Sequence, residues 1–341
     1  MAAGAAGDGS VPAVRQAPPL DAELAAVLAK ADAAAREPLT WENLASRQSR
    51  DAVARPRPGL ERLADGGRFE VAELRVPRDP GGPDAGEVTV VSARPAGSEG
   101  TLPWLYYLHG GGMVMGNAWS VLPRLLREWA LPLGVAVLSV DYRLAPGTRY
   151  PGPLADCRAG LLWALAHADG LGLDPERVVI GGKSAGGGLA AALALLLRDR
   201  GEPCPLGLLM LSPMLDDRND SFSSHQMAGH DPWDRVSNAT AWRAALGDRW
   251  GAPDLPPYAA PGRAEDLSGL PAAYVEVGSA ETFRDEAVSF ADRVWRAGGE
   301  AELHVWPGAF HGFDTLAPEA ALSRDAREAR LRWLRRVLRG G

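Results

Sequence analysis

Short apolar runs bounded by turn residues alternate with longer amphipathic stretches along most of the chain. Strands are predicted at 68–76, 87–93, 105–108, 135–140, 177–180, 206–211, 273–277 and 302–306. Helices are predicted at 121–130, 153–168, 185–200, 285–297 and 318–339. Strands that alternate with helices favour an α/β fold in which helices cover both faces of a mostly parallel, eight-stranded sheet. The first two strands alternate apolar and polar residues, which predicts an antiparallel edge.

Two segments interrupt this alternation and are expected to form a helical cap over the strand ends. Residues 20–50 carry a loosely helical pattern, with Asp21 as the expected N-cap. An insertion at about 216–261 mixes charged, aromatic and helical pieces between two core strands, and insertions of this length usually form lids or binding elements. The main domain is expected to span 51–341 and to contain this insertion. The Ala-, Gly- and Pro-rich residues 1–19 are expected to form a flexible tail.

Composition and charge exclude several classes of protein. Hydrophobic residues make up 46% of the 341 residues and charged residues 23%, as in ordinary globular chains. The net charge of −7 gives no electrostatic reason to expect nucleic acid as a ligand. Cys157 and Cys204 alone make neither a disulfide framework nor a zinc site. No stretch has the roughly 18 apolar residues of a membrane helix, and no signal-peptide pattern is present, so a soluble, cytoplasmic protein is expected.

The C-terminal helical stretch raises the nucleic-acid question once more, because it carries seven arginines between Arg324 and Arg339. Acidic residues interleave with these arginines, and leucine and valine side chains form an apolar stripe. This pattern predicts an amphipathic surface helix whose charges face solvent.

A G-x-S-x-G sequence at 182–186 is the most specific candidate for chemistry. A predicted strand precedes it and an Ala/Leu-rich helix follows it, which is the context of a nucleophile elbow. In such an elbow a sharp turn exposes the serine, here Ser184, at the edge of the sheet. The alternative at this point is a glycine-rich turn with an incidental serine.

The sequence His109-Gly110-Gly111-Gly112 follows an earlier apolar strand. A glycine run in this position can aim backbone N–H groups at a developing oxyanion. A flexible loop and a phosphate-binding loop are the alternatives, but the glycine spacings typical of phosphate loops are absent. Its position before the G-x-S-x-G sequence favours an oxyanion-hole element of a serine hydrolase.

The chain order of such an enzyme then predicts an acid followed by a histidine nearer the C-terminus. Of six histidines, His311 lies just past the last predicted strand, at the sheet edge where α/β folds place their sites. The acid is expected after strand 273–277, where Glu281 and Asp285 compete. Glu281 is favoured because Asp285 suits the first turn of the next helix, where the helix dipole attracts negative charge.

Together these motifs resemble the hormone-sensitive-lipase-like branch of the α/β-hydrolase esterases, of the bacterial carboxylesterase type, over roughly residues 102–313. The resemblance extends to DYRLAP at 141–146, SPMLD at 212–216 and HGF at 311–313. In the family's D-P-x-x-D-E stretch the first position matches Glu281 and the second aspartate matches Asp285. The resemblance implies an oxyanion hole formed by the amides of Gly111, Gly112 and Ala185.

The resemblance also implies a capped pocket for the substrate. Met113, Met115 and Trp119 are the expected substrate-binding residues. Further candidates for the cap and pocket are Trp41, His225, His230, Trp233 and Trp242. Lys183 and Met113 depart from the family pattern, which indicates a pocket of altered shape or charge.

The expected activity is hydrolysis of short-to-medium acyl esters by Ser184, His311 and Glu281, with no metal or organic cofactor. The expected partner is a small-molecule ester, and a homodimer is compatible with this reading. Acyl transfer, lactone hydrolysis or cyclisation by the same residues is an alternative outcome. A ligand receptor without catalysis, as in the plant gibberellin receptors, is the alternative from a different class.

Overall fold

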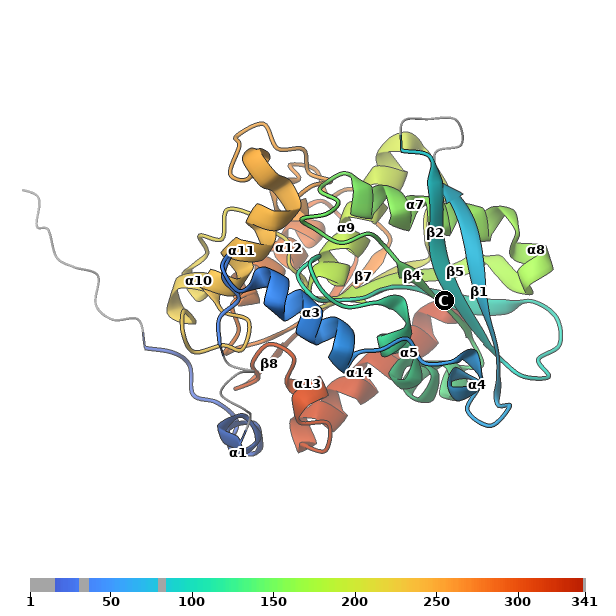
Figure 1. Cartoon of the computed structure of the whole chain (residues 1–341), viewed down its shortest axis with the longest axis horizontal. Coiled ribbons are helices and arrows are strands. Elements are labelled where there is room, and N and C mark those ends of the chain that lie inside the picture. The colour runs from blue at the N-terminus through green and yellow to red at the C-terminus, as the bar shows by residue number, and fades with distance from the viewer. Residues whose placement is uncertain (1–15, 31–36, 79–83, 340–341) are drawn as a thin grey trace, which may run out of the picture.

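A central eight-stranded sheet organises the computed structural model, which describes residues 16–30, 37–78 and 84–339 (Figure 1). The strands are β1 (Phe69–Arg78), β2 (Gly86–Pro95), β3 (Leu102–Leu108), β4 (Ala136–Asp141), β5 (Leu173–Lys183), β6 (Gly207–Leu211), β7 (Ala272–Gly278) and β8 (Ala301–Trp306). Their order in the sheet is β1-β2-β4-β3-β5-β6-β7-β8. The β1–β2 and β2–β4 pairs are antiparallel and all other pairs are parallel. The predicted mostly parallel sheet with an antiparallel edge is therefore confirmed.

Helices cover both faces of this sheet (Figure 1). The longer helices are α1 (Ala22–Lys30), α3 (Leu44–Ala54), α5 (Ala118–Leu125), α7 (Gly152–Ala166), α9 (Ala185–Arg200), α11 (Arg235–Leu246), α12 (Arg284–Arg296) and α14 (Ala321–Leu338). The short helices are α4 (Leu60–Leu63), α6 (Leu131–Leu133), α8 (Ala168–Leu171), α10 (Phe222–Gln226) and α13 (Phe313–Leu316). A π-helical turn, η1 (Leu126–Ala130), and two 3₁₀ turns, η2 (Gly247–Arg249) and η3 (Pro261–Arg263), complete the set.

Two hydrophobic cores lie on opposite faces of the sheet. Because successive strand residues point to opposite faces, Leu105 and Val179 pack toward α5, η1 and α14. Their neighbours Tyr106 and Ile180 pack toward α7, α9 and α12. Both faces of the central strands are therefore buried, which explains why these strands are continuous apolar runs in the sequence.

Helix α3 lies on the loop that follows β3. The Gln48 amide donates to the carbonyls of Val114 and Ala145, at 2.8 and 2.9 Å. The Asp51 carboxylate accepts a hydrogen bond from the Gly116 N–H at 2.9 Å. The predicted boundary between residues 50 and 51 falls inside this helix, which continues to Ala54.

Helix α1 begins at its predicted N-cap and packs elsewhere, beside the loop after β8. The Asp21 carboxylate accepts from the N–H groups of Glu23 and Leu24, and the Leu24 side chain packs with Phe310. Of the tail predicted at 1–19, residues 1–15 lie outside the described part of the chain. No helix in the described part is long and apolar enough to cross a bilayer.

Candidate active site

Ser184 occupies the sharp turn between β5 and α9. Its backbone has φ 58° and ψ −123°, a conformation that is strained for a residue with a side chain. The turn is held by hydrogen bonds from the Ser184 N–H to the Leu211 carbonyl (2.8 Å) and from the Met214 N–H to the Ser184 carbonyl (3.1 Å). Strained conformations of this kind persist only where the surrounding structure determines them, and they gather at functional sites.

The glycines of the G-x-S-x-G sequence are required by close backbone contacts around this turn. A Cβ atom at Gly186 would lie 2.0 Å from the Leu108 carbonyl oxygen. A Cβ atom at Gly182 would lie 2.3 Å from the Gly186 backbone. Strand and helix therefore approach each other as closely as the sequence motif predicts.

A chain of hydrogen bonds links Ser184 to His311 and Glu281. The His311 Nε2 atom lies 3.1 Å from the Ser184 hydroxyl oxygen, and its Nδ1 atom lies 2.7 Å from Glu281 Oε1. The Glu281 carboxylate is fully buried, whereas the Ser184 residue is 5% exposed. The Phe283 ring packs in a T-shaped arrangement with the His311 imidazole at a centroid distance of 5.1 Å. Three residues widely separated in the sequence thus form one connected unit.

The second oxygen of Glu281 is also fully engaged. Glu281 Oε2 accepts hydrogen bonds from the Gly278 N–H at 2.8 Å and from the Ser212 hydroxyl at 3.0 Å. Ser212 follows β6 and belongs to the SPMLD motif, but nothing in the sequence indicated that its hydroxyl holds the acid. These two donors fix the carboxylate in the orientation that faces His311.

Asp285 does not reach the histidine. It lies in the first turn of α12, where its carboxylate accepts from the Ser223 N–H at 2.7 Å and from the Arg284 guanidinium at 2.8 Å. The structure therefore places Glu281, and not Asp285, against His311.

The glycine loop after β3 lies beside the serine: a Cβ atom at Gly110 would lie 3.4 Å from the Ser184 Cβ atom, and Gly110 and Gly111 line the same cleft as Ser184. Gly111 and Gly112 have φ values of 118° and 63°, which favour glycine. Among the described residues, no acceptor takes a hydrogen bond from the N–H of Gly111 or Gly112. Ala185 is the first residue of α9, a position whose N–H has no acceptor within the helix.

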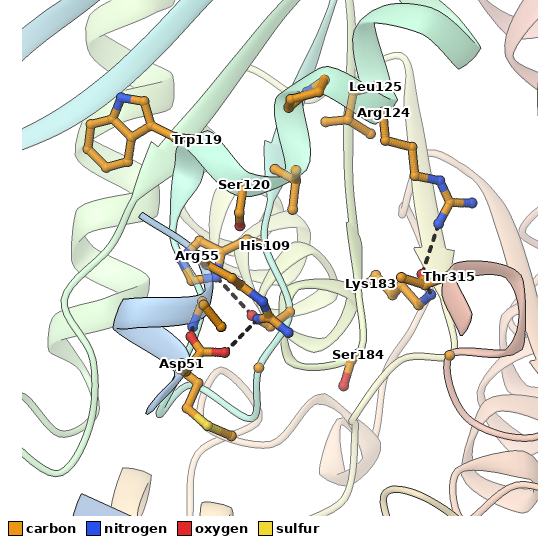
Figure 2. Close-up of a pocket in the computed structure, with 18 of the residues that line it drawn as sticks. Asp51, Arg55, His109, Trp119, Ser120, Arg124, Leu125, Lys183, Ser184 and Thr315 are labelled. Atoms are coloured by element: carbon orange, nitrogen blue, oxygen red, sulfur yellow. Dashed lines mark hydrogen bonds and ion pairs between the residues drawn. The ribbon is translucent and has the colours of Figure 1, made fainter. Parts of the chain in front are cut away.

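A cleft of about 1200 Å³ opens beside Ser184. Figure 2 shows Ser184 between the Asp51–Arg55 pair on one side and Lys183 with Thr315 on the other. Of the predicted substrate-binding residues, Met115 and Trp119 line this cleft.

Met113 is not among the residues that line this cleft, and its contact with substrate stays a prediction. It is 8% exposed and packs in the core, and its backbone has a positive φ of 61°. Of the wider candidates, only Trp233 lines the cleft. Trp242 is buried in the core and His225 pairs with Asp220. Trp41 is 42% exposed, and the Arg243 guanidinium lies over its ring.

Lys183, beside the candidate nucleophile, is part of a buried charge network. Its ammonium lies 2.5 Å from the Asp314 carboxylate, which also pairs with Arg124 (2.7 Å) and Arg330 (2.6 Å). Burial opposes ionisation of Asp314, but the three cations outweigh it and hold its pKa well below its ordinary value. Burial lowers the pKa of Lys183. Lys183 thus pairs with Asp314 at the wall of the cleft, which both residues line.

Arg330 corrects the prediction of a fully solvated arginine face on the C-terminal helix. It is 1% exposed, and its guanidinium pairs with Glu276 as well as with Asp314. These carboxylates come from other parts of the chain, so the helix sequence alone gave no sign of the burial.

We expect Asp314→Ala to lower the free energy of unfolding by about 3–5 kcal/mol, because it leaves buried cations uncompensated. Asp325→Ala, at an exposed position of α14, the helix that carries Arg330, is the control and should change the free energy of unfolding by no more than about 0.5 kcal/mol. Because the pKa of Asp314 is depressed in the fold, its contribution is present above the ordinary aspartate pKa near 4 and is lost as the pH falls below it. Urea unfolding at several pH values measures both effects, and equal losses in the two variants would contradict the expectation.

No group of three or more histidine, cysteine or acidic side chains in the described ranges is arranged to hold a metal ion.

The site contains a strained serine at a strand-to-helix turn, a histidine that is hydrogen-bonded to this serine, and a buried acid. Together with the strand order of the sheet, these features define a serine hydrolase with the α/β-hydrolase fold. A family model described as alpha/beta hydrolase fold matches residues 105–315. The chain is 32% identical over 284 residues to esterase LipI of Mycobacterium tuberculosis, covering 78% of this chain and 86% of that protein. It is 35% identical over 239 residues to carboxylesterase NlhH of the same organism, covering 70% and 74%.

Solved structures agree with these relatives. A bacterial heroin esterase superposes with a TM-score of 0.84 at 37% identity, covering 94% of this chain and 98% of that one. Esterase LipW from Mycobacterium marinum superposes with a TM-score of 0.81 at 32% identity, covering 95% and 98%. The chain therefore belongs to the hormone-sensitive-lipase-like esterases of the α/β-hydrolase fold, as its motifs predict.

Proposed function

We propose that the protein is a carboxylesterase that cleaves small-molecule esters with Ser184 as the nucleophile. The observation that carries this proposal is the continuous chain of hydrogen bonds from Ser184 through His311 to the buried Glu281. In the first step the Ser184 oxygen attacks the acyl carbon while His311 Nε2 takes the hydroxyl proton. Glu281 holds the imidazole in the required orientation and stabilises its charged form.

The amides of Gly111, Gly112 and Ala185 are the proposed donors to the tetrahedral oxyanion. The unoccupied amides in the glycine loop support this assignment. A donor of this kind contributes about 3 kcal/mol to stabilisation of the transition state in comparable sites. His311 then returns its proton to the leaving alcohol. Water, activated by the same histidine, resolves the acyl-enzyme without a metal or an organic cofactor.

We expect p-nitrophenyl esters with acyl chains of two to eight carbons to be hydrolysed fastest, because an apolar, partly closed cleft loses fit once the chain outgrows it. Initial rates across esters from C2 to C12 measure this preference, with Ser184→Ala as the background control. Faster turnover of C16 esters with activation at an oil–water interface would contradict it.

The same residues also serve acyl transfer or cyclisation if another nucleophile replaces water, and lactone hydrolysis if the ester is cyclic. Product analysis with and without a competing alcohol distinguishes transfer from hydrolysis. The absence of any p-nitrophenyl acetate hydrolysis would instead favour a receptor without catalysis. A cytoplasmic location and a homodimer stay predictions from the sequence.

A further inference from the structure

Asp231, in the insertion after β6, is buried directly behind the proposed catalytic residues. It is 6% exposed and lies four residues before α11. One carboxylate oxygen accepts a hydrogen bond from the His311 N–H at 3.0 Å, and the other accepts from the Thr282 N–H at 2.9 Å. One side chain of the insertion therefore bonds to the backbone of the proposed base and to the residue next to Glu281.

Trp233 adds contacts from the same segment. Its carbonyl accepts a hydrogen bond from the Thr282 hydroxyl at 2.8 Å, and its ring lies 6.4 Å from the His311 imidazole between centroids. The ring also fills the space beside Gly112, where a Cβ atom would lie 2.5 Å from it. The segment 231–233 thus contacts the loops of the proposed acid, base and oxyanion hole together.

The charges that face Asp231 come from the loops after β7 and β8. Burial is the largest influence and raises the pKa of Asp231 to about 7. The charge of His311 and the two N–H donors lower the pKa, while the charge of Glu281 raises it. On its own segment, the neighbouring Asp234 is turned away to cap α11. A positive charge on His311 and a negative charge on Asp231 therefore stabilise each other.

We propose that Asp231 is a positioning residue of the esterase reaction, which aligns the base and acid loops and stabilises the imidazolium of His311 with its charge. This inference rests on the proposed function. It gives the insertion a part in positioning the base and acid loops, in addition to any role in covering the cleft.

Asp231→Asn tests the proposal, because an amide of nearly the same shape removes the charge and replaces one acceptor by a donor. We expect kcat for p-nitrophenyl acetate to fall by about 10²-fold, as for a small misplacement of catalytic groups, with KM within about twofold. Without the neighbouring charge the imidazolium is stabilised less. The acid limb of the kcat/KM profile should therefore move to lower pH, which a merely structural role would not cause.

Asp234→Asn is the matched control. The Asp234 carboxylate also accepts from two backbone N–H groups, those of Ser237 at 2.9 Å and Gly229 at 3.3 Å, but it touches none of the proposed catalytic residues. We expect this variant to melt at nearly the same temperature, because asparagine caps a helix about as well as aspartate and only the bond from the Gly229 N–H is lost, while kcat and the acid limb stay unchanged.

The pH dependence of thermal stability tests the role of Asp231 independently of activity. Because the pKa of Asp231 is raised in the fold, the folded state binds more protons than the unfolded state between about pH 4 and 7. Ionisation of Asp231 thus costs stability as the pH rises through this window. The Tm of Asp231→Asn relative to the unmodified protein should increase between pH 5 and pH 8.

Asp231→Ser, with a smaller side chain, serves as a second variant if the asparagine variant does not fold. We expect kcat, the acid limb and the pH dependence of Tm to change in the same directions as in Asp231→Asn. Unchanged kcat in a folded variant would overturn the proposal. A loss of kcat with an unmoved acid limb and a pH-independent change of Tm would also overturn it. If Ser184→Ala retained activity, the proposed function itself would fail, whereas dependence on Ser184 with indifference to Asp231 would reject this inference alone.

Discussion

Replacing Ser184 by alanine is expected to lower kcat for p-nitrophenyl acetate by about 10⁶-fold while leaving the fold intact. The substitution removes one oxygen, whose hydrogen-bond partner is His311, and leaves the backbone contacts of the turn in place. The remaining rate would come from the backbone amides and from substrate binding alone. Initial rates on purified protein, with the Tm and circular dichroism of both forms, measure the effect.

Ser212→Ala is the matched control for this experiment. Ser212 also directly follows a strand and has a positive φ, 46°, and its hydroxyl donates to Glu281 and does not line the cleft. We expect kcat to fall only about tenfold in Ser212→Ala, because the Glu281 carboxylate keeps its hydrogen bonds to His311 and Gly278. Near-normal turnover in Ser184→Ala would place the nucleophile elsewhere.

Glu281→Gln is expected to lower kcat by about 10⁴-fold with KM little changed. The neutral amide no longer stabilises the imidazolium, and it can present an N–H to His311 Nδ1, which favours the wrong tautomer. Because Glu281 is fully buried, little room is left for a water molecule to stabilise the imidazolium in place of the carboxylate. Steady-state kinetics on the folded variant separate this effect from a loss of substrate binding.

Asp285→Asn is the corresponding control at the rival acid. Its carboxylate holds the Ser223 N–H at the start of α10, so the expected result is a lower Tm and a much smaller loss of kcat. The reverse ranking of the two variants would assign the acid to Asp285 and reject Glu281, while the other proposed residues would keep their roles.

Local patterns predicted most of the sheet, but glycines concealed the end of its central strand. The prediction ended that strand at Ile180, because Gly181 and Gly182 are typical of turns. In the structure β5 continues to Lys183, since the two glycines pair with Leu209 and Met210 of β6. Glycine serves here for close approach of the backbone, which a single sequence does not distinguish from a turn.

Interactions between distant residues account for most of what the sequence left out. Met113 is an apolar side chain that suits a pocket wall, but it packs in a core formed by residues from many elements. The sequence pattern places Arg330 on a solvated helix face, whereas the fold brings Glu276 and Asp314 into contact with its guanidinium. Asp231 lies 80 residues from His311, and no local pattern marks it as a partner of that loop.

The most direct test of the central claim is covalent labelling with a fluorophosphonate, followed by peptide mass analysis. The reagent reacts with a serine only where a base activates it and donors hold the phosphoryl oxygen, so it reports the assembled site. We predict one adduct, on Ser184, together with complete loss of ester hydrolysis. An adduct on another residue, or full activity in protein labelled at Ser184, would contradict the assignment.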